Sequence, residues 1–361
     1  MKNLLRKVTL ALAMLMCLVA CPMKTVQAED ILLEFTKDIT IGTTLEDTLT
    51  AANGRYNFKL NRSGTLTVQI GFKEGSGYSW GYHGGITLYD CDGAKIANVG
   101  VDDDTKGTDS GVFTVDVLAG DYYFIVDRKG NAASNYIITT SYVDSGETVV
   151  DSLLDTHDSQ ANPISLPLKK KYTGHIADNS ASDVYKVVMK KSQMLKISVT
   201  NRTNGINLAI INTNNTVNAQ YKITEKSGTV KLFCPKGTYY ITMSKYADCG
   251  SYTISTSASA LAKTKITKLK NVKGKYMSVK FQLKSLESAA GYHIQYSTDK
   301  KFKKGKKNVY ISNSDYLKST QTIYVGKKKT YYVRIRTYME DNRGDQYYSA
   351  WSSVKKIKIK K

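Results

Sequence analysis

The sequence has few of the residues from which catalytic and metal sites are usually built. Its four histidines stand far apart, and none has a metal-binding spacing such as His-x-x-x-His. It has no Gly-x-Ser-x-Gly element, no phosphate-binding glycine loop and no Cys–His–Asn arrangement. We therefore predict that the chain is not an enzyme and carries no cofactor. The alternative is a catalytic site of an unfamiliar kind in the first domain.

Long apolar runs are also missing, with one exception at the start of the chain. Lys2, Arg6 and Lys7 precede an apolar run at 8–20, and small residues around Ala28 suit a signal peptidase. We expect 1–28 to be a signal peptide and the mature chain to work outside the cytoplasm, secreted or at the cell surface. Cys21 follows Leu-Val-Ala, so lipidation at that residue is the alternative. No later segment is long and apolar enough to span a bilayer, so no transmembrane segment is expected.

Cysteine is too scarce for a disulfide framework. Three remain after the N-terminal segment, Cys91, Cys234 and Cys249, and an odd number in a secreted chain argues against full pairing. An expected strand at 238–244 would hold Cys234 and Cys249 roughly 20 Å apart, at about 3.3 Å per residue, too far for a bond. We expect three free thiols, mostly buried.

Acidic residues are nearly absent from the last hundred positions. Residues 262–361 contain 26 Lys+Arg and 6 Asp+Glu, a net charge of +20, whereas 29–261 have 22 and 25, a net charge of −3. A run at the centre of this domain is the candidate for binding an anionic surface: Lys300, Lys301, Lys303, Lys304, Lys306 and Lys307. A solvated strand edge that blocks aggregation is the structural alternative. Because secretion excludes most nucleic-acid roles, the expected partner is an anionic cell-wall polymer or glycan.

Tyrosine, by contrast, is abundant at 26 residues and recurs with Val, Ile and Thr in short alternating runs. The middle of the chain repeats itself: Gly120, Tyr122, Tyr123 and Tyr136 answer to Gly237, Tyr239, Tyr240 and Tyr252. Alternation with period two and frequent turn signals predict sandwiches with one sheet face on a core. We predict an all-β chain of three β-sandwich domains in series, at 33–143, 160–259 and 262–361, with a linker at 144–159.

The first copy is longer than the second, largely at "GFKEGSGYSWGYHGGI", which the second copy answers with "TNRTNGI". Since the scaffold does not need this extension, Tyr78, Trp80 and Tyr82 are candidates for an exposed ligand-binding platform. Packing of the same aromatics over the sheet end is the alternative.

Two acidic stretches raise the question of calcium. "YDCDG" is interpreted as a hairpin turn with Asp-Gly at its centre, because these residues suit such turns. "VDDDTKGTD" gathers Asp102, Asp103 and Asp104, which makes them candidate calcium ligands. A solvated acidic loop is the alternative, and it is favoured because the second copy has no such cluster.

The two copies resemble the bacterial pre-peptidase C-terminal domain. The resemblance lies in a Tyr-x-Phe strand, the "LYDCDGAKI" hairpin, a Gly-x-Tyr-Tyr strand and a terminal Tyr-x-Ile strand. It implies jelly-roll-like sandwiches of the kind often appended to secreted enzymes and related to collagen-binding modules. Some relatives bind calcium, but no ligand set transfers residue by residue.

The last domain resembles a fibronectin type III domain of the Lys-rich kind found in surface proteins of Gram-positive gut anaerobes. "KKKTYYVRIRTYM" places Tyr331 where that family keeps its corner tyrosine, and Phe281 stands where the family usually has Trp. The resemblance implies a spacer or adhesion module. His293, out of phase with Tyr292 and Ile294, is expected on the solvent face of its strand.

These observations favour a non-catalytic binding or adhesion protein of the cell surface, held on an anionic wall by its basic C-terminal domain. Its further ligand would be a glycan or an extracellular matrix protein. The alternative function is an accessory, substrate-targeting subunit of a secreted hydrolase system.

Overall fold

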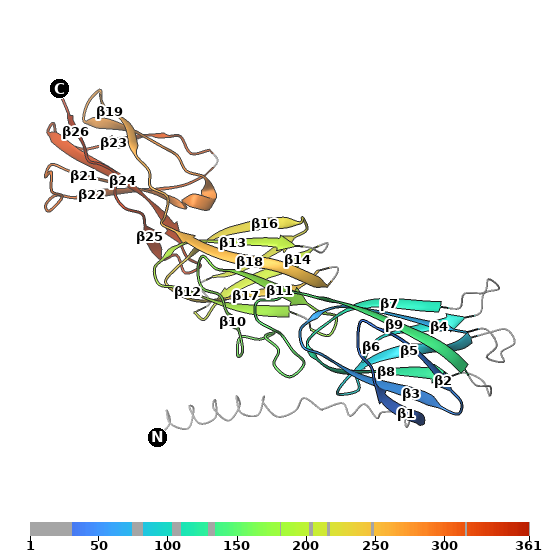
Figure 1. Cartoon of the computed structure of the whole chain (residues 1–361). Helices are drawn as coiled ribbons and strands as arrows, with labels where there is room; N and C mark the ends of the chain where they lie inside the picture. The colour runs from blue at the N-terminus through green and yellow to red at the C-terminus, as the bar shows by residue number, and fades with distance from the viewer. Residues whose placement is uncertain are drawn as a thin grey trace, which may run out of the picture.

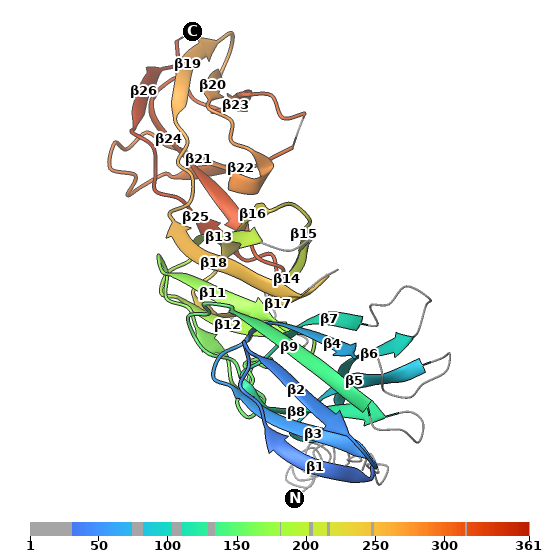
Figure 2. The same ribbon diagram turned by 45° about the vertical axis from the view of Figure 1, so that its right-hand side comes forward.

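The computed structural model describes residues 31–73, 82–102, 110–128, 134–180, 182–201, 205–214, 217–246, 249–314 and 316–360. Over these residues the chain is built from β-strands, with one short 3-10 turn at Leu286–Ser288. The strands form three β-sandwiches that follow one another in the order of the sequence (Figure 1 and Figure 2). The predicted all-β architecture of three sandwiches in series is confirmed.

The first sandwich packs a five-stranded sheet of order β1-β3-β8-β5-β6 against a four-stranded sheet of order β2-β9-β4-β7. Inward side chains alternate with outward ones, so that Leu66, Val68 and Ile70 of one strand are fully buried. β1 runs parallel to β3, and the other pairs in these two sheets are antiparallel. The strands are β1 (Leu33–Asp38), β2 (Thr44–Leu49), β3 (Asn53–Leu60), β4 (Gly64–Phe72), β5 (Tyr82–Asp90), β6 (Lys95–Asp102), β7 (Ser110–Val117), β8 (Gly120–Arg128) and β9 (Ser134–Asp144).

The second sandwich repeats this topology strand for strand. Its sheets have the orders β10-β12-β17-β14-β15 and β11-β18-β13-β16, which match those of the first sandwich when each strand is advanced by nine. The internal repeat seen in the sequence is therefore a repeat of structure. The strands are β10 (Ile164–Ser165), β11 (Lys171–Ile176), β12 (Ser182–Met189), β13 (Gln193–Asn201), β14 (Ile206–Asn212), β15 (Asn218–Ile223), β16 (Ser227–Cys234), β17 (Gly237–Lys245) and β18 (Gly250–Ser259).

A buried pair of tyrosines binds a carboxylate in each copy, but the carboxylate comes from different strands. In the first sandwich, Tyr56 lies within hydrogen-bonding distance of Tyr136 and donates to Asp47 of β2, with an O–O distance of 2.6 Å to the carboxylate. In the second, Tyr252 donates to Asp183 of β12, and its hydroxyl oxygen lies 2.9 Å from that of Tyr185, within hydrogen-bonding distance. Both arrangements satisfy hydroxyls that would otherwise be buried without partners.

In the second sandwich, Gly174 occupies the position that corresponds to Asp47 in the first. Asp47 pairs with Tyr136 across β2 and β9, whereas Gly174 pairs with Tyr252 across β11 and β18. A Cβ added to Gly174 would lie 2.6 Å from the Tyr252 ring and would also overlap the Tyr185 hydroxyl. Each sandwich therefore has room for one carboxylate at this point of its core.

The first two sandwiches are joined by hydrogen bonds between their adjoining ends. The Asp178 amide donates to the Asp116 carbonyl at 2.7 Å, and the Asp116 amide donates to the Asp178 carboxylate at 3.1 Å. The Asn179 side chain donates to the Tyr122 hydroxyl at 3.0 Å. His175 is 1% exposed beside Asp116, and burial lowers the pKa of its imidazole. The joint is thus a packed, hydrogen-bonded contact.

The third sandwich has the strand arrangement of a fibronectin type III-like domain. A three-stranded sheet, β19-β20-β23, faces a sheet of order β22-β21-β24-β25, with β26 also paired to β24. Phe281 is 2% exposed and packs on Tyr292, so it fills the core where the family usually has Trp. The strands are β19 (Ile266–Val272), β20 (Tyr276–Phe281), β21 (Gly291–Ser297), β22 (Lys307–Ser312), β23 (Thr320–Tyr324), β24 (Thr330–Glu340), β25 (Gln346–Tyr348) and β26 (Lys355–Lys358).

The expectation that His293 faces solvent is wrong, because it is only 2% exposed. Its ring stacks on Tyr310 at a centroid distance of 4.4 Å and also contacts Trp351 at 4.9 Å. The Arg336 guanidinium lies 4.2 Å from the Trp351 ring and donates to Nδ1 of His293 at 3.1 Å. Aromatic and arginine side chains thus cover the outer face of this sheet, which strand periodicity alone does not reveal.

The three cysteines of the described residues are free thiols, as expected. Cys234 and Cys249 are buried in the second sandwich, whereas Cys91 is exposed in the turn after β5. Burial raises the pKa of the Cys234 thiol to about 12, which keeps it protonated and unreactive in the folded chain.

Candidate functional site

The extended loop that carries the aromatic candidates lies mostly outside the described residues. This applies to Tyr78 and Trp80, whereas Tyr82 is the first residue of β5 and its side chain is not described. Tyr82 pairs in register with Asp102, the last residue of β6. The aromatic segment and the acidic segment therefore start from adjacent strand ends at one end of the first sandwich.

The candidate calcium ligands are in a similar position. Asp102 ends β6, its side chain is not described, and Asp103 and Asp104 lie outside the described residues. Among the residues that the structure does describe, no group of three His, Cys, Asp or Glu side chains is placed to hold a metal ion. In the other acidic stretch, the Asp90 carboxylate accepts from the amides of Asp92 and Ala94, and Gly93 has φ +83°. That stretch is the hairpin turn that was expected.

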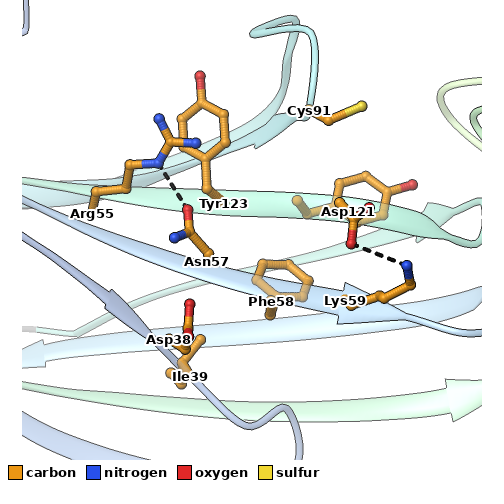
Figure 3. Close-up of a pocket in the computed structure, with 10 residues that line it drawn as sticks. Asp38, Ile39, Arg55, Asn57, Phe58, Lys59, Cys91, Asp121 and Tyr123 are labelled. Carbon is orange, nitrogen blue, oxygen red and sulfur yellow. Dashed lines mark hydrogen bonds and ion pairs between the residues drawn. The ribbon is translucent and has the colours of Figure 1, made fainter.

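A groove of about 410 Å³ crosses the outer face of the five-stranded sheet in the first sandwich (Figure 3). Arg55 and Asn57 of β3 and Tyr123 of β8 line one part of it, and Lys59 and Asp121 line another. The Arg55 guanidinium lies 3.7 Å from the centre of the Tyr123 ring and donates to Asn57 at 2.9 Å. The aromatic surface continues into Tyr89, whose ring stacks on Tyr123 at 5.1 Å. A cation held over a ring in this way is already oriented for a ligand.

The side chains that line this groove offer a guanidinium, an amide, an aromatic ring and a lysine–aspartate pair. Its cysteine, Cys91, has a thiol pKa raised first by burial and then by the charges of Asp92 and Asp90, so the thiolate is disfavoured. No histidine is among the residues that line the groove. The second sandwich keeps a tyrosine, Tyr240, at the place of Tyr123 but has Val184 at the place of Arg55, so the cation over the ring belongs to the first copy.

The lysines of the third sandwich gather at one end, which we call the basic tip. It comprises three loops, 273–275, 300–306 and 327–329, together with the C-terminal Lys360. Val325 donates to Lys275 at 2.9 Å and Ile359 donates to Lys329 at 3.0 Å, which connects two of the loops and the C-terminal segment. The loop 300–306 lies at the same end because Ser297, the last residue of β21, pairs with Tyr332 near the start of β24. Every described lysine in the tip is exposed: Lys273, Lys275, Lys300, Lys301, Lys303, Lys304, Lys306, Lys327, Lys328, Lys329 and Lys360. Figure 1 shows this end, with the C-terminus, pointing away from the second sandwich.

The loop 300–306 has a fixed shape. Asp299 accepts hydrogen bonds from the amides of Lys301 and Lys303, which hold the pKa of its carboxyl below the usual range. Phe302 has φ +55°, a region that bulky residues seldom adopt, and its ring is 5% exposed beneath the Arg334 guanidinium. Burial of this ring anchors the loop and leaves the neighbouring lysines directed into solvent.

A tyrosine corner fixes the loop 327–329. The Tyr331 hydroxyl donates to the carbonyls of Val325 at 3.1 Å and Lys327 at 3.0 Å. This confirms the role expected for Tyr331 from the resemblance. The three consecutive lysines of this loop are evident in the sequence, but only the fold places them at the same end of the domain as Lys300–Lys306.

The positive charge of this domain is not neutralised internally. Among the described residues of 262–360, no lysine or arginine forms an ion pair with a carboxylate. Two of its acidic side chains accept hydrogen bonds from backbone amides in turns instead. Asp299 accepts from the Lys301 amide, and Asp341 accepts from the amides of Arg343 and Asp345. The tip therefore presents unpaired cations with a strong local field.

In the described part of the chain, no helix is long and apolar enough to cross a membrane.

The sequence matches neither a family model nor a curated protein. Similar solved structures include the following three. The pre-peptidase C-terminal domain of collagenase from Bacillus anthracis is 19% identical, with 26% of this chain and 93% of that chain covered and a TM-score of 0.25. A β-1,2-glucanase from Parabacteroides distasonis is 13% identical, with 52% and 32% covered and a TM-score of 0.19. The FN1–FN3 domains of chicken CNTN1 are 12% identical, with 85% and 98% covered and a TM-score of 0.23. Because the identities and TM-scores are low, the fold of each sandwich is described from its own strand order.

Proposed function

We propose that the protein is a non-catalytic binding protein of the extracellular surface, held on an anionic cell-wall polymer or glycan by its basic tip. The observation that carries this proposal is the set of exposed lysines without ion-pair partners in loops of fixed shape. Single exposed ion pairs contribute roughly 0–1 kcal/mol, but many cations on one rigid end act on a polymer together.

The groove of the first sandwich is proposed to read a second ligand, a glycan or an extracellular protein. Its aromatic surface at Tyr123 and Tyr89 offers a stacking face, and Arg55 and Asn57 offer fixed polar groups beside it. Such a combination is typical of binding sites on rigid scaffolds. The groove and the tip belong to different sandwiches, the first and the third, so one chain can bind both partners.

The test compares two sets of charge changes in the full mature chain. The tip variant replaces Lys300, Lys301, Lys303 and Lys304 with Gln, and the control replaces four exposed lysines of the second sandwich: Lys190, Lys191, Lys231 and Lys236. Both lose the same charge, so only the tip variant should elute from purified anionic wall at clearly lower salt. Because the Debye length falls to about 3 Å at 1 M salt, wild-type binding should be lost there.

Equal elution of the two variants would contradict the proposal. So would binding that survives 1 M salt, or equal binding by residues 29–261 without the third sandwich.

A further inference from the structure

The outer face of the sheet β19-β20-β23 carries a regular grid of side chains, which we call the lysine–tyrosine face. Residues that pair across neighbouring strands point to the same side of a sheet, so the register defines three rows. The rows are Lys268–Lys280–Thr320, Lys270–Ser278–Thr322 and Val272–Tyr276–Tyr324. Alternate residues Met277, Val279 and Phe281 fill the core on the other side.

One end of this face concentrates positive charge. Lys268 and Lys280 are direct partners across two strands, and Lys270 is the next residue on the same side of β19. Like charges placed opposite each other destabilise a sheet. The lysines at 270 and 280 lower the pKa of Lys268, with Lys270 contributing most. No described acid stands in any of the three rows.

The other end of the face is aromatic and exposed. Tyr276 and Tyr324 have ring centroids 5.1 Å apart and remain 41% and 56% exposed. Val272 beside them is 38% exposed. This row adjoins the basic tip, because Val272 precedes the loop 273–275 and Tyr324 precedes the segment 325–329.

We propose that the lysine–tyrosine face binds a strand of acidic polysaccharide that continues onto the basic tip. The tyrosine pair stacks on sugar rings, and the three lysines hold the carboxylate or sulfate groups of the same strand. This inference rests on the proposed function and names its ligand class.

The spacing of the face suits a chain of linked sugars, and its chemistry favours a polysaccharide over a polyol phosphate. The tyrosine row and the far lysine row are four residues apart along β20, roughly 13 Å at about 3.3 Å per residue, a span of several sugar rings. Exposed tyrosine rings gain contact energy from the flat faces of sugars. A flexible polyol phosphate presents negative charge without such faces, so only the lysines would bind it.

The test measures the affinity of the full mature chain for two polymers, polygalacturonate and poly(glycerol phosphate), at the same ionic strength. The variant Tyr276→Ala with Tyr324→Ala should bind polygalacturonate about tenfold more weakly, a loss of about 1.4 kcal/mol. Its affinity for poly(glycerol phosphate) should stay within about twofold. The control, Tyr316→Ala, removes a tyrosine of the same sandwich that is 95% exposed and should change neither affinity.

A second variant keeps the test valid if loss of the tyrosines harms folding. Lys268→Gln with Lys280→Gln removes the opposed charges, so it should raise the melting temperature of the third sandwich while it weakens polygalacturonate binding. An unchanged polygalacturonate affinity in this variant would count against the face.

The outcomes separate the two proposals. If the tyrosine variant has an equally reduced affinity for both polymers, or an unchanged affinity for both, the lysine–tyrosine face is not a polysaccharide site. This holds even when the tip variant no longer binds either polymer. If instead the tip variant keeps its affinity for both polymers, the proposed function is wrong. The result for the tyrosine variant then still shows whether the lysine–tyrosine face binds polysaccharide.

Discussion

Gly174→Ala tests whether the tyrosine–carboxylate arrangement of the second sandwich controls its stability. Gly174 is fixed between Tyr185 and Tyr252, and an added Cβ would lie 2.6 Å from the Tyr252 ring. Both rings are fully buried, so neither has room to move away. The methyl group therefore forces the tyrosines apart at the point where Tyr252 donates to Asp183.

Two costs contribute to the expected loss of stability. Overpacking of a well-packed core costs about 1–3 kcal/mol. If the shift also breaks the hydrogen bond to Asp183, a buried acceptor loses its donor, at a further cost of about 1–3 kcal/mol. We expect the free energy of unfolding of the second sandwich to fall by about 2–6 kcal/mol when both costs apply, at the upper end of single substitutions.

The cysteines provide an assay specific to this sandwich. Cys234 and Cys249 are buried in it and react with a thiol reagent only when it opens, whereas exposed Cys91 of the first sandwich reacts at once and serves as reference. With a urea slope of about 1–3 kcal/mol/M, the labelling midpoint of Cys234 should fall by at least about 0.7 M.

Gly237→Ala is the matched control for this experiment. It lies in the same sandwich, and the nearest atom to its added Cβ is 3.9 Å away. It should change the free energy of unfolding by about 0.5 kcal/mol or less and so move the midpoint little. If Gly174→Ala and Gly237→Ala behave alike, the packing argument for this core is refuted.

Three further predictions concern pH, the tip and the extended loop. Burial raises the pKa of Asp183, so this group contributes stability that is present in acid and lost as pH rises through its folded pKa; Asp183→Asn should flatten that decline in urea unfolding, and an unchanged pH profile would contradict this. Tyr331→Phe removes two hydrogen bonds and should lower the stability of the third sandwich by about 1–2 kcal/mol, measured by calorimetry, and weaken wall binding. Trp80→Ala should reduce ligand retention with little change in melting if the loop is a platform, whereas a loss of roughly 3–5 kcal/mol would identify a packing residue.

Much of the fold was predictable because period-two alternation and the repeat are local signals. Leu66, Val68 and Ile70 are buried as their spacing indicates, and Tyr331 has the corner role that the resemblance implied. Strand order within each sheet depends instead on pairing between residues far apart in sequence, which composition does not show, and the resemblance implied only the kind of sandwich.

The site was less predictable, for two physical reasons. His293 was expected to face water because alternation assumes that one sheet face is bare, but Arg336 of β24 and Trp351, from the segment between β25 and β26, cover that face. The sequence indicated a basic run at 300–307, yet loops at 273–275 and 327–329 join it only through folding. The groove around Arg55 and Tyr123 gave no sequence signal, because its residues are ordinary outward positions of two strands.

The hydrogen-bonded joint between the first two sandwiches has a mechanical consequence. The mutual bonds of Asp116 and Asp178, with Asn179 held on Tyr122, leave these two sandwiches little freedom to swing at that point. A rigid connection between two domains transmits force and keeps their distance fixed, whereas a flexible linker extends under force and lets the domains sample many positions. A chain held at its C-terminal end would therefore display the groove on a stiff pair of sandwiches. Weakening this joint would change how far the groove stands from the anchor while leaving every binding residue in place.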